Sequence, residues 1–209
     1  MAHIIGESTQ ITGNLDVTGS ITGSIARSNI ALETKVLEIP LTSLRVWDAF
    51  QTTLPSVGAS DDIGLTAGTF GTAQPYLRSQ DLNAAGAITT EYARGKVTLP
   101  LEFVSYASVY FRLCAGMLTS VAATSATVDF EAYLCSRTAS TISGSDLVTT
   151  SATSVNSTTL SDKDFTVNSA ALVGGSVLDF RLAFAATSAT ASSHFLIATH
   201  LELVFTVRQ

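Results

Sequence analysis

The chain carries little charge. Only 13% of its 209 residues are Asp, Glu, Lys or Arg, about half the usual charged fraction of a soluble domain. Ser, Thr and Ala are abundant instead, so long stretches of surface cost little to remove from water. Such a surface is expected of a protein that packs against other proteins.

Basic clusters and long apolar runs are also missing. The formal net charge is −6 and the Lys and Arg residues are scattered, which argues against a nucleic-acid partner. The longest apolar runs, such as 183–186 and 196–199, fall far short of the roughly 20 residues that a membrane helix needs. The first residues have neither the basic region nor the apolar core of a signal peptide, so we expect assembly in the cytoplasm of the producing cell.

Cysteine is nearly absent. Cys114 and Cys135 each end a strand-like run, and a disulfide between them is geometrically conceivable. Two buried free thiols in a reducing compartment are the favoured interpretation. Without a C-x-x-C pair, the cysteines do not predict a metal site.

Motifs of catalysis are missing too. The sequence holds no Gly-x-Ser-x-Gly elbow, Walker loop or dinucleotide fingerprint. His194, His200 and Glu202 would share one face of a regular strand. However, six residues of strand separate the two histidines by roughly 20 Å, too far for one ion. Three copies of His200 meeting at a trimer axis are an alternative, but a solvated sheet face is favoured.

Carboxylates have two possible roles. Asp61, Asp62 and Asp81 match no EF-hand spacing and are better explained as turn residues than as calcium ligands. Paired acids for sugar hydrolysis could come together only in the fold; the candidates on or near predicted strands are Glu91, Glu102, Asp129, Glu131 and Asp179. Cross-strand ion pairs on an exterior face are the favoured interpretation. We therefore predict no catalytic residue, no cofactor and no metal ion.

The N-terminal region repeats a short unit. Ile11-Thr12-Gly13, Val17-Thr18-Gly19 and Ile21-Thr22-Gly23 are short extended pieces, each ended by a Gly that tolerates positive φ. Such a segment cannot bury its aliphatic side chains alone and must lay them against a partner. We predict an extended arm over residues 1–31 whose docking residues are Ile11, Leu15, Val17, Ile21, Ile25 and Ile30.

Alternating apolar and polar residues dominate the rest of the chain. This pattern is typical of half-buried antiparallel strands. It predicts strands at 32–41, 96–104, 108–114, 127–135, 164–167, 176–184 and 194–207, and a short one at 146–150. In the last strand Phe195, Ile197, Leu201, Leu203, Phe205 and Val207 share one parity.

Two regions lack this periodicity. Residues 44–50 hold the only tryptophan, Trp47, and suit either a strand or one helical turn. Residues 54–90 read as a long Gly-rich loop. With about eight strands and no convincing helix after residue 50, residues 32–209 are predicted to form an all-β body, an antiparallel jelly-roll sandwich. An Ig-like sandwich is the competitor, but its Cys–Trp–Cys spacing is absent.

The layout resembles small structural proteins of tailed bacteriophages. The resemblance rests on the Ile/Val-Thr-Gly arm, DDIGLTAGTFGT (61–72), RGKVTLPLEFV (94–104), and the closing GGSVLDFRLAF (174–184) and LELVFTV (201–207). Phage capsid cement, or decoration, proteins and some tail-fibre heads look similar. The resemblance implies a homotrimer on the capsid exterior of the virion, with the arm running along the major capsid protein.

Three functions therefore remain open. The first is a non-enzymatic cement protein that binds the major capsid protein through its arm. The second is a tail-fibre or spike head that binds host glycan, and the third is a carbohydrate-active enzyme on a jelly-roll scaffold. The short arm favours the first over a fibre. Aromatic residues make up 8% of the chain and mostly fall on core positions, which leaves few for sugar stacking.

Overall fold

The computed structural model describes residues 31–82, 88–118, 123–136, 138–140, 142, 144–188 and 192–208. The chain divides into two units, Met1–Ala31 and Leu32–Gln209. All six predicted docking residues of the arm lie outside the described residues. In the described part of the chain, no helix is long and apolar enough to cross a membrane.

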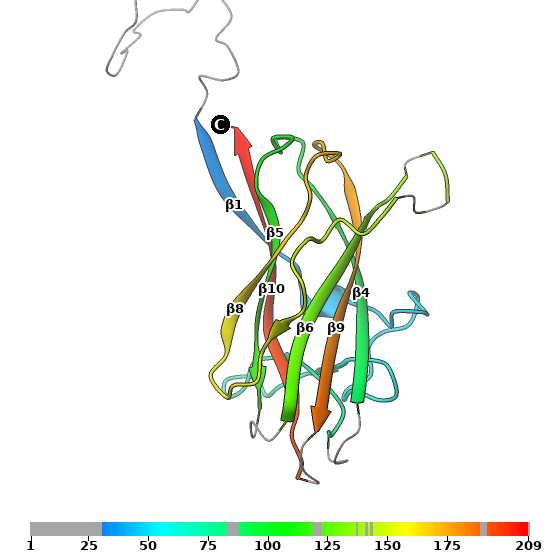
Figure 1. The fold of residues 1–209 in the computed structure, drawn as a ribbon, viewed down its shortest axis with the longest axis vertical. Coiled ribbons are helices and arrows are strands. Elements are labelled where there is room, and N and C mark those ends of the chain that lie inside the picture. Colours follow the sequence, from blue (N-terminus) through cyan, green and yellow to red (C-terminus); the bar gives the residue numbers. More distant parts are fainter. Residues whose placement is uncertain are drawn as a thin grey trace, which may run out of the picture. The chain divides into compact units, whose positions relative to one another are not determined.

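The described residues form ten strands and one short 3-10 helix (Figure 1). In chain order these are β1 (Leu32–Glu38), η2 (Leu41–Ser43), β2 (Gly64–Thr66), β3 (Tyr76–Arg78), β4 (Ile88–Thr98), β5 (Val109–Met117), β6 (Ala123–Leu134), β7 (Thr153–Ser154), β8 (Ser161–Thr166), β9 (Val177–Ser188) and β10 (Leu196–Arg208).

The strands form two antiparallel sheets in jelly-roll order. One sheet has the order β1-β10-β5-β8, and the other has the order β4-β9-β6-β7. The small strands β2 and β3 extend the first sheet, with β3 pairing near the start of β10 and β1 near its end. Eight principal strands in two antiparallel sheets with these orders are the jelly-roll arrangement. The predicted all-β jelly-roll sandwich is confirmed.

Alternation in the sequence explains the core. On β9, Leu178, Phe180, Leu182 and Phe184 are all buried, as their spacing predicts. At the centre of the sandwich the ring of Phe130 lies 5.1 Å from Phe111 and 4.9 Å from Phe165, measured between centroids. Because β5 and β8 belong to one sheet and β6 to the other, these rings join the two layers.

The last strand departs from its predicted single parity. The register between β10 and β5 shifts between Ala198 and His200, which is the mark of a β-bulge. Before the bulge Leu196 and Ala198 belong to the core, and after it Leu201 and the alternate residues that follow do so. The placement of Phe195 and Ile197 on the same face as Leu201 was therefore wrong, because one extra residue reverses the alternation.

Three other boundaries differ from the predictions. The strand predicted at 96–104 is β4, which starts at Ile88 and ends at Thr98; a turn follows at Pro100, so Leu101 is 79% exposed. Residues 54–90 contain β2, β3 and the start of β4, strands too short to show periodicity except for β4. The short strand expected at 146–150 is only a bridge from Val148 to Val167.

Residues 44–50 form neither a strand nor a helical turn. Arg45 makes isolated bridges to Arg94 and Thr53, and the chain then turns through Trp47 and Asp48. Backbone hydrogen bonds between Arg45 and Arg94, at 2.9 and 3.0 Å, hold this segment on the edge of β4. It therefore borders the outer face of the second sheet.

Candidate functional site

The outer face of the β4-β9-β6 sheet carries a ladder of charged side chains. In register, Arg94 of β4 lies opposite Arg181 of β9, and Arg181 lies opposite Glu131 of β6. Two like charges directly opposite each other repel. Each arginine is compensated by a carboxylate, Arg181 by Glu131 across the strands and Arg94 by Asp179 on the diagonal.

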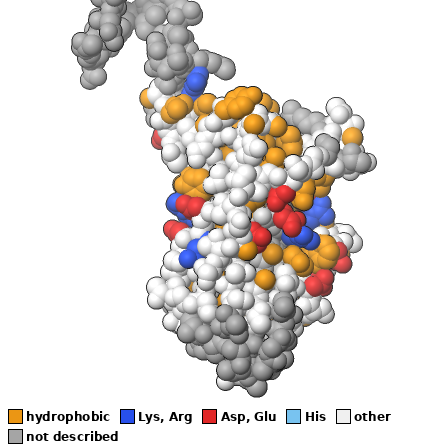
Figure 2. Space-filling model, viewed as in Figure 1, with side chains coloured by type: hydrophobic (Ala, Val, Ile, Leu, Met, Phe, Trp, Pro, Cys, Tyr) orange, Lys and Arg blue, Asp and Glu red, His pale blue; other side chains and the backbone are white. Residues whose placement is uncertain are grey.

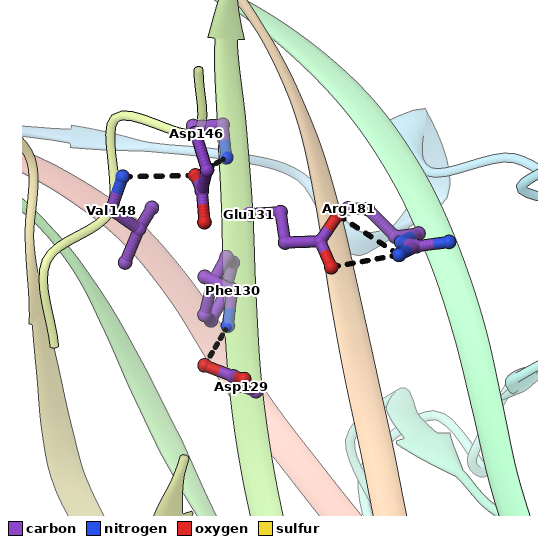
Figure 3. A network of polar contacts seen from close by, with 7 residues as sticks. Asp129, Phe130, Glu131, Asp146, Val148 and Arg181 are labelled. Atoms are coloured by element: carbon purple, nitrogen blue, oxygen red, sulfur yellow. Dashed lines mark hydrogen bonds and ion pairs between the residues drawn. The ribbon is translucent and has the colours of Figure 1, made fainter. Parts of the chain in front are cut away.

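Both ion pairs have short hydrogen bonds. Nη2 of Arg181 donates to both carboxylate oxygens of Glu131, at 2.7 and 2.9 Å (Figure 3). Nε and Nη2 of Arg94 donate to the two oxygens of Asp179, at 2.7 and 2.6 Å. The two parallel hydrogen bonds between Arg94 and Asp179 have the fork geometry, which is the strong form of an arginine–carboxylate contact. The hydrogen bonds to Asp179 raise the pKa of Arg94.

Asp179 is the most deeply placed charge of the ladder. Its side chain is only 4% exposed, and Nζ of Lys96 lies 3.6 Å from its Oδ2. Two cations therefore compensate one nearly buried carboxylate.

Aromatic rings cover one side of this ladder. The indole of Trp47 lies 5.3 Å from the ring of Tyr92, and its Nε1 donates to Oδ2 of Asp61 at 3.0 Å. The guanidinium of Arg181 lies 4.4 Å from the ring centroid of Tyr92 and 5.3 Å from that of Trp47. Phe50 lies beside Arg94, at 5.2 Å. These cation–π contacts tie the 45–62 segment to the sheet.

Trp47 and the paired side chains of the ladder border a hollow of about 320 Å³, which we call the aromatic hollow. Its lining residues are Trp47, Asp48, Arg94, Glu131, Tyr133, Ile142, Asp179, Phe180 and Arg181. Desolvation, and secondarily the charge of Glu131, raises the pKa of Tyr133 at its border. The hollow therefore combines hydrogen-bonding groups of both kinds with aromatic walls.

The buried carboxyl group of Glu91 holds the segment that follows β3 against β4. Glu91 is completely buried, and its two oxygens accept from the backbone N–H of Gln80 at 2.9 and 3.1 Å. Burial raises the pKa of Glu91 to about 7, with a further contribution from the charge of Asp62. Burial also raises the pKa of Asp62, whose neighbours Asp61 and Asp48 add to the effect.

The five carboxylates considered for hydrolysis lie in different surroundings, although two of them, Glu131 and Asp179, line the aromatic hollow together. Glu131 and Asp179 are held in ion pairs with arginines, and Glu91 faces the interior. Asp129 accepts a hydrogen bond from the backbone of the next residue at 2.9 Å, and Glu102 is exposed in the turn after β4. Cross-strand ion pairs are thus present where they were predicted, although Arg181 pairs with Glu131 and not with Asp179.

A neighbouring contact fixes the edge of β6. Oδ1 of Asp146 accepts from the backbone of Ala132 and Val148, at 2.8 and 2.9 Å, while Glu131 points away from it toward Arg181 (Figure 3). Asp146 therefore acts as a structural bridge between the 144–150 segment and the strand.

The histidines and cysteines lie apart. His194 is buried with Nδ1 2.7 Å from the carbonyl of Ser192, whereas His200 is exposed beyond the bulge. Cys114 and Cys135 are free thiols, but both are half-buried and not buried as predicted. Within the described ranges, no group of three or more His, Cys, Asp or Glu side chains is arranged to hold a metal ion.

A second surface lies at the end of the sandwich where β1 begins. Leu32, Leu101, Tyr106 and Val173 are all more than half exposed there, and we call this surface the apolar end. Leu32 pairs with Arg208, Val104 hydrogen-bonds to Thr206, and the backbone of Leu101 packs on Gly174, which links these segments. Figure 2 shows apolar side chains gathered at this end.

The aromatic hollow was missed in the sequence. Trp47 and Tyr133 are both only partly buried, and both line it, contrary to the expectation that few aromatic residues remain outside the core. The sequence does hold an indication of it: the alternate residues of β6 and β9 that face away from the core place Tyr133, Glu131 and Arg181 on one face of the sheet.

No protein-family model matches this chain, and no curated protein matches it.

Proposed function

We propose that this protein is a non-enzymatic structural component of a phage virion. It decorates the exterior of the capsid by binding the major capsid protein through residues 8–30, after assembly in the host cytoplasm. The jelly-roll body associates with two further copies of itself.

The apolar end is the observation that carries this proposal. Leu101 and Tyr106 are 79% and 78% exposed. Large apolar side chains that gather on the surface in this way are typical of a site of protein contact. Burying such side chains stabilises an interface by roughly 1.5–3 kcal/mol each. The adjacent strand β1 has β10 as its only strand partner among the described residues, and its Val36 is 54% exposed. An open strand edge beside apolar side chains is suited to protein contact.

The charged groups support a non-enzymatic role. The ladder arginines bind Glu131 and Asp179 in short ion pairs, so these acids are not positioned as a free acid and base.

Holding three arms on one trimer raises the effective concentration of the second and third arm, which compensates for weak binding of each.

Deletion of residues 1–30 tests the proposal. The truncated protein should remain folded and trimeric by light scattering, yet fail to co-sediment with particles of the parent phage. As a matched control, Leu101→Ser with Tyr106→Ser in the full chain should weaken trimer formation while leaving the arm intact. Unchanged particle binding after the deletion would contradict an arm-mediated attachment, and monomers after the deletion would make the arm a clasp between subunits.

A further inference from the structure

We propose that the aromatic hollow binds a neutral glycan. This inference concerns a different surface from the apolar end and does not depend on capsid attachment. It also does not require turnover, because the hollow offers recognition groups without a free acid–base pair.

Hydrogen-bonding groups of both kinds face the hollow. Arg181 uses only Nη2 in its ion pair, so within the described residues its Nε and Nη1 remain as donors. Arg94 likewise keeps Nη1. Asp48 is exposed at the border of the hollow and offers carboxylate acceptors. Planar donors and acceptors at fixed positions suit the hydroxyl groups of a sugar, each of which both donates and accepts.

The ion pairs fix these groups in place. Because Glu131 and Asp179 hold the two guanidinium groups by short hydrogen bonds, little side-chain freedom is lost when a ligand arrives. Tyr92 holds Arg181 from a third direction at 4.4 Å. The site is therefore organised before binding.

The walls are apolar. Trp47, Tyr133 and Ile142 line the hollow, and they match the C–H face that a sugar ring presents between its hydroxyl groups. The volume of about 320 Å³ lies at the lower end of the roughly 300–1,000 Å³ of small-molecule sites, which suits a short saccharide.

The charge balance decides between sugar classes. Among the lining residues, the two arginines face three acids: Asp48, Glu131 and Asp179. Both arginines are already compensated. Beside the hollow, Lys96 adds one positive charge at Asp179 and Asp61 adds one negative charge at Trp47, so three cations face four acids. An acidic sugar would bring another negative charge to this face, so a neutral one is selected.

The single tryptophan gives a direct assay, because Trp47 is the only indole in the chain and lies in the hollow. The full-length protein is titrated with neutral saccharides (glucose, galactose, mannose, N-acetylglucosamine and their oligomers) and with glucuronic and sialic acids, while the fluorescence of Trp47 is followed. At least one neutral saccharide should shift the emission in a saturable manner, and the acids should not. If no neutral saccharide shifts the emission up to tens of millimolar, or if the acids bind as well, the proposal is wrong.

Variants locate the binding. Arg181→Ala should weaken the binding of the active saccharide about tenfold or more by calorimetry, and Arg181→Lys should also weaken it because a lysine lacks the planar fork. Arg112→Ala, which removes a comparable arginine from the other sheet, is the matched control and should leave affinity unchanged. Asp48→Asn provides a second exposed test position. Equal weakening by Arg112→Ala, or none by Arg181→Ala and Asp48→Asn, would place the binding elsewhere.

Discussion

The outer faces of the two sheets carry the same kind of contact in different surroundings. On the β10-β5-β8 sheet, Arg112 donates to Asp164 at 2.8 and 3.1 Å, and the aspartate is 47% exposed. On the β4-β9-β6 sheet, Arg94 binds Asp179, which is 4% exposed. Both pairs follow from alternating polar residues on neighbouring strands.

The difference comes from a loop and not from the strands. The 45–62 segment places Trp47 and Phe50 against the charged side chains of the β4-β9-β6 sheet. In the described part of the chain, Arg112 has a ring contact with Tyr110, which belongs to its own strand. Partial removal from water strengthens the electrostatic contacts and creates a hollow where the other face has a solvated ion pair. A covering segment thus turns an ordinary ladder into a candidate binding site.

The first prediction displaces the 45–62 segment from the outer face of the β4-β9-β6 sheet. The backbone of Gly58 packs against the Gln80 amide and the Glu91 carboxylate so closely that an added Cβ would collide with both. Gly58→Ala should therefore displace the loop and cost roughly 3 kcal/mol or more of unfolding free energy, with a red-shifted Trp47 emission. Gly71→Ala is the control: its φ is +80° but an added Cβ meets nothing within 4 Å, so it should cost only about 1–2 kcal/mol. Equal effects at the two positions would mean that the loop is not held at Gly58.

The contrast between faces also explains what sequence reasoning can and cannot find. The alternation on β5, β6 and β9 predicted the buried rings of Phe111, Phe130 and Phe180, because burial of one face is a local property of strand geometry. It likewise placed Glu131 and Arg181 on an exterior face. What it left out is how the 45–62 segment folds over that face, since this depends on contacts such as Trp47 to Asp61 that no periodicity encodes.

Small irregularities in the strands explain the predictions that were wrong. One extra residue in β10 reversed the predicted face of Ile197, and the turn at Pro100 exposed Leu101 despite its core parity. The burial of Glu91 was also unexpected, because a charged residue on a strand normally faces water. Its raised pKa and its hydrogen bond from Gln80 depend on the segment after β3, whose position no periodicity in the sequence indicates.

The second prediction uses the pKa of Glu91, whose carboxyl group lies against Gly58 of the 45–62 segment, to change the stability of this region with pH. Its pKa rises from 4.5 to about 7 on folding, so the folded state favours the neutral carboxyl. This contribution is complete below about pH 4.5 and is lost as the pH rises to 7, by at most about 3 kcal/mol. Glu91→Gln should remove this loss, so that urea denaturation gives a flatter pH profile between 4.5 and 7.

Asp62 and Asp129 are the internal check on that profile. Burial raises the pKa of both carboxyls, so each adds to the same trend. Asp62→Asn and Asp129→Asn should each flatten the profile less than Glu91→Gln. If Glu91→Gln keeps the full slope, the pH dependence belongs to these two aspartates and not to the fastening of the loop.

The third prediction compares the two ladders directly. Asp179→Asn removes a charge that is only 4% exposed and that both Arg94 and Lys96 contact, whereas Asp164→Asn removes a charge that is 47% exposed and leaves Asp162 beside Arg112. We expect losses of about 2 kcal/mol for Asp179→Asn and less than 1 kcal/mol for Asp164→Asn, measured by urea denaturation at pH 7. Salt sharpens the test, because ions screen exposed charges more than covered ones. Raising the salt from 0.05 to about 1 M should abolish the effect of Asp164→Asn and preserve most of the effect of Asp179→Asn. If both variants lose the same free energy with the same salt dependence, the loop does not shield its ladder from solvent, and the difference between the faces is one of shape alone.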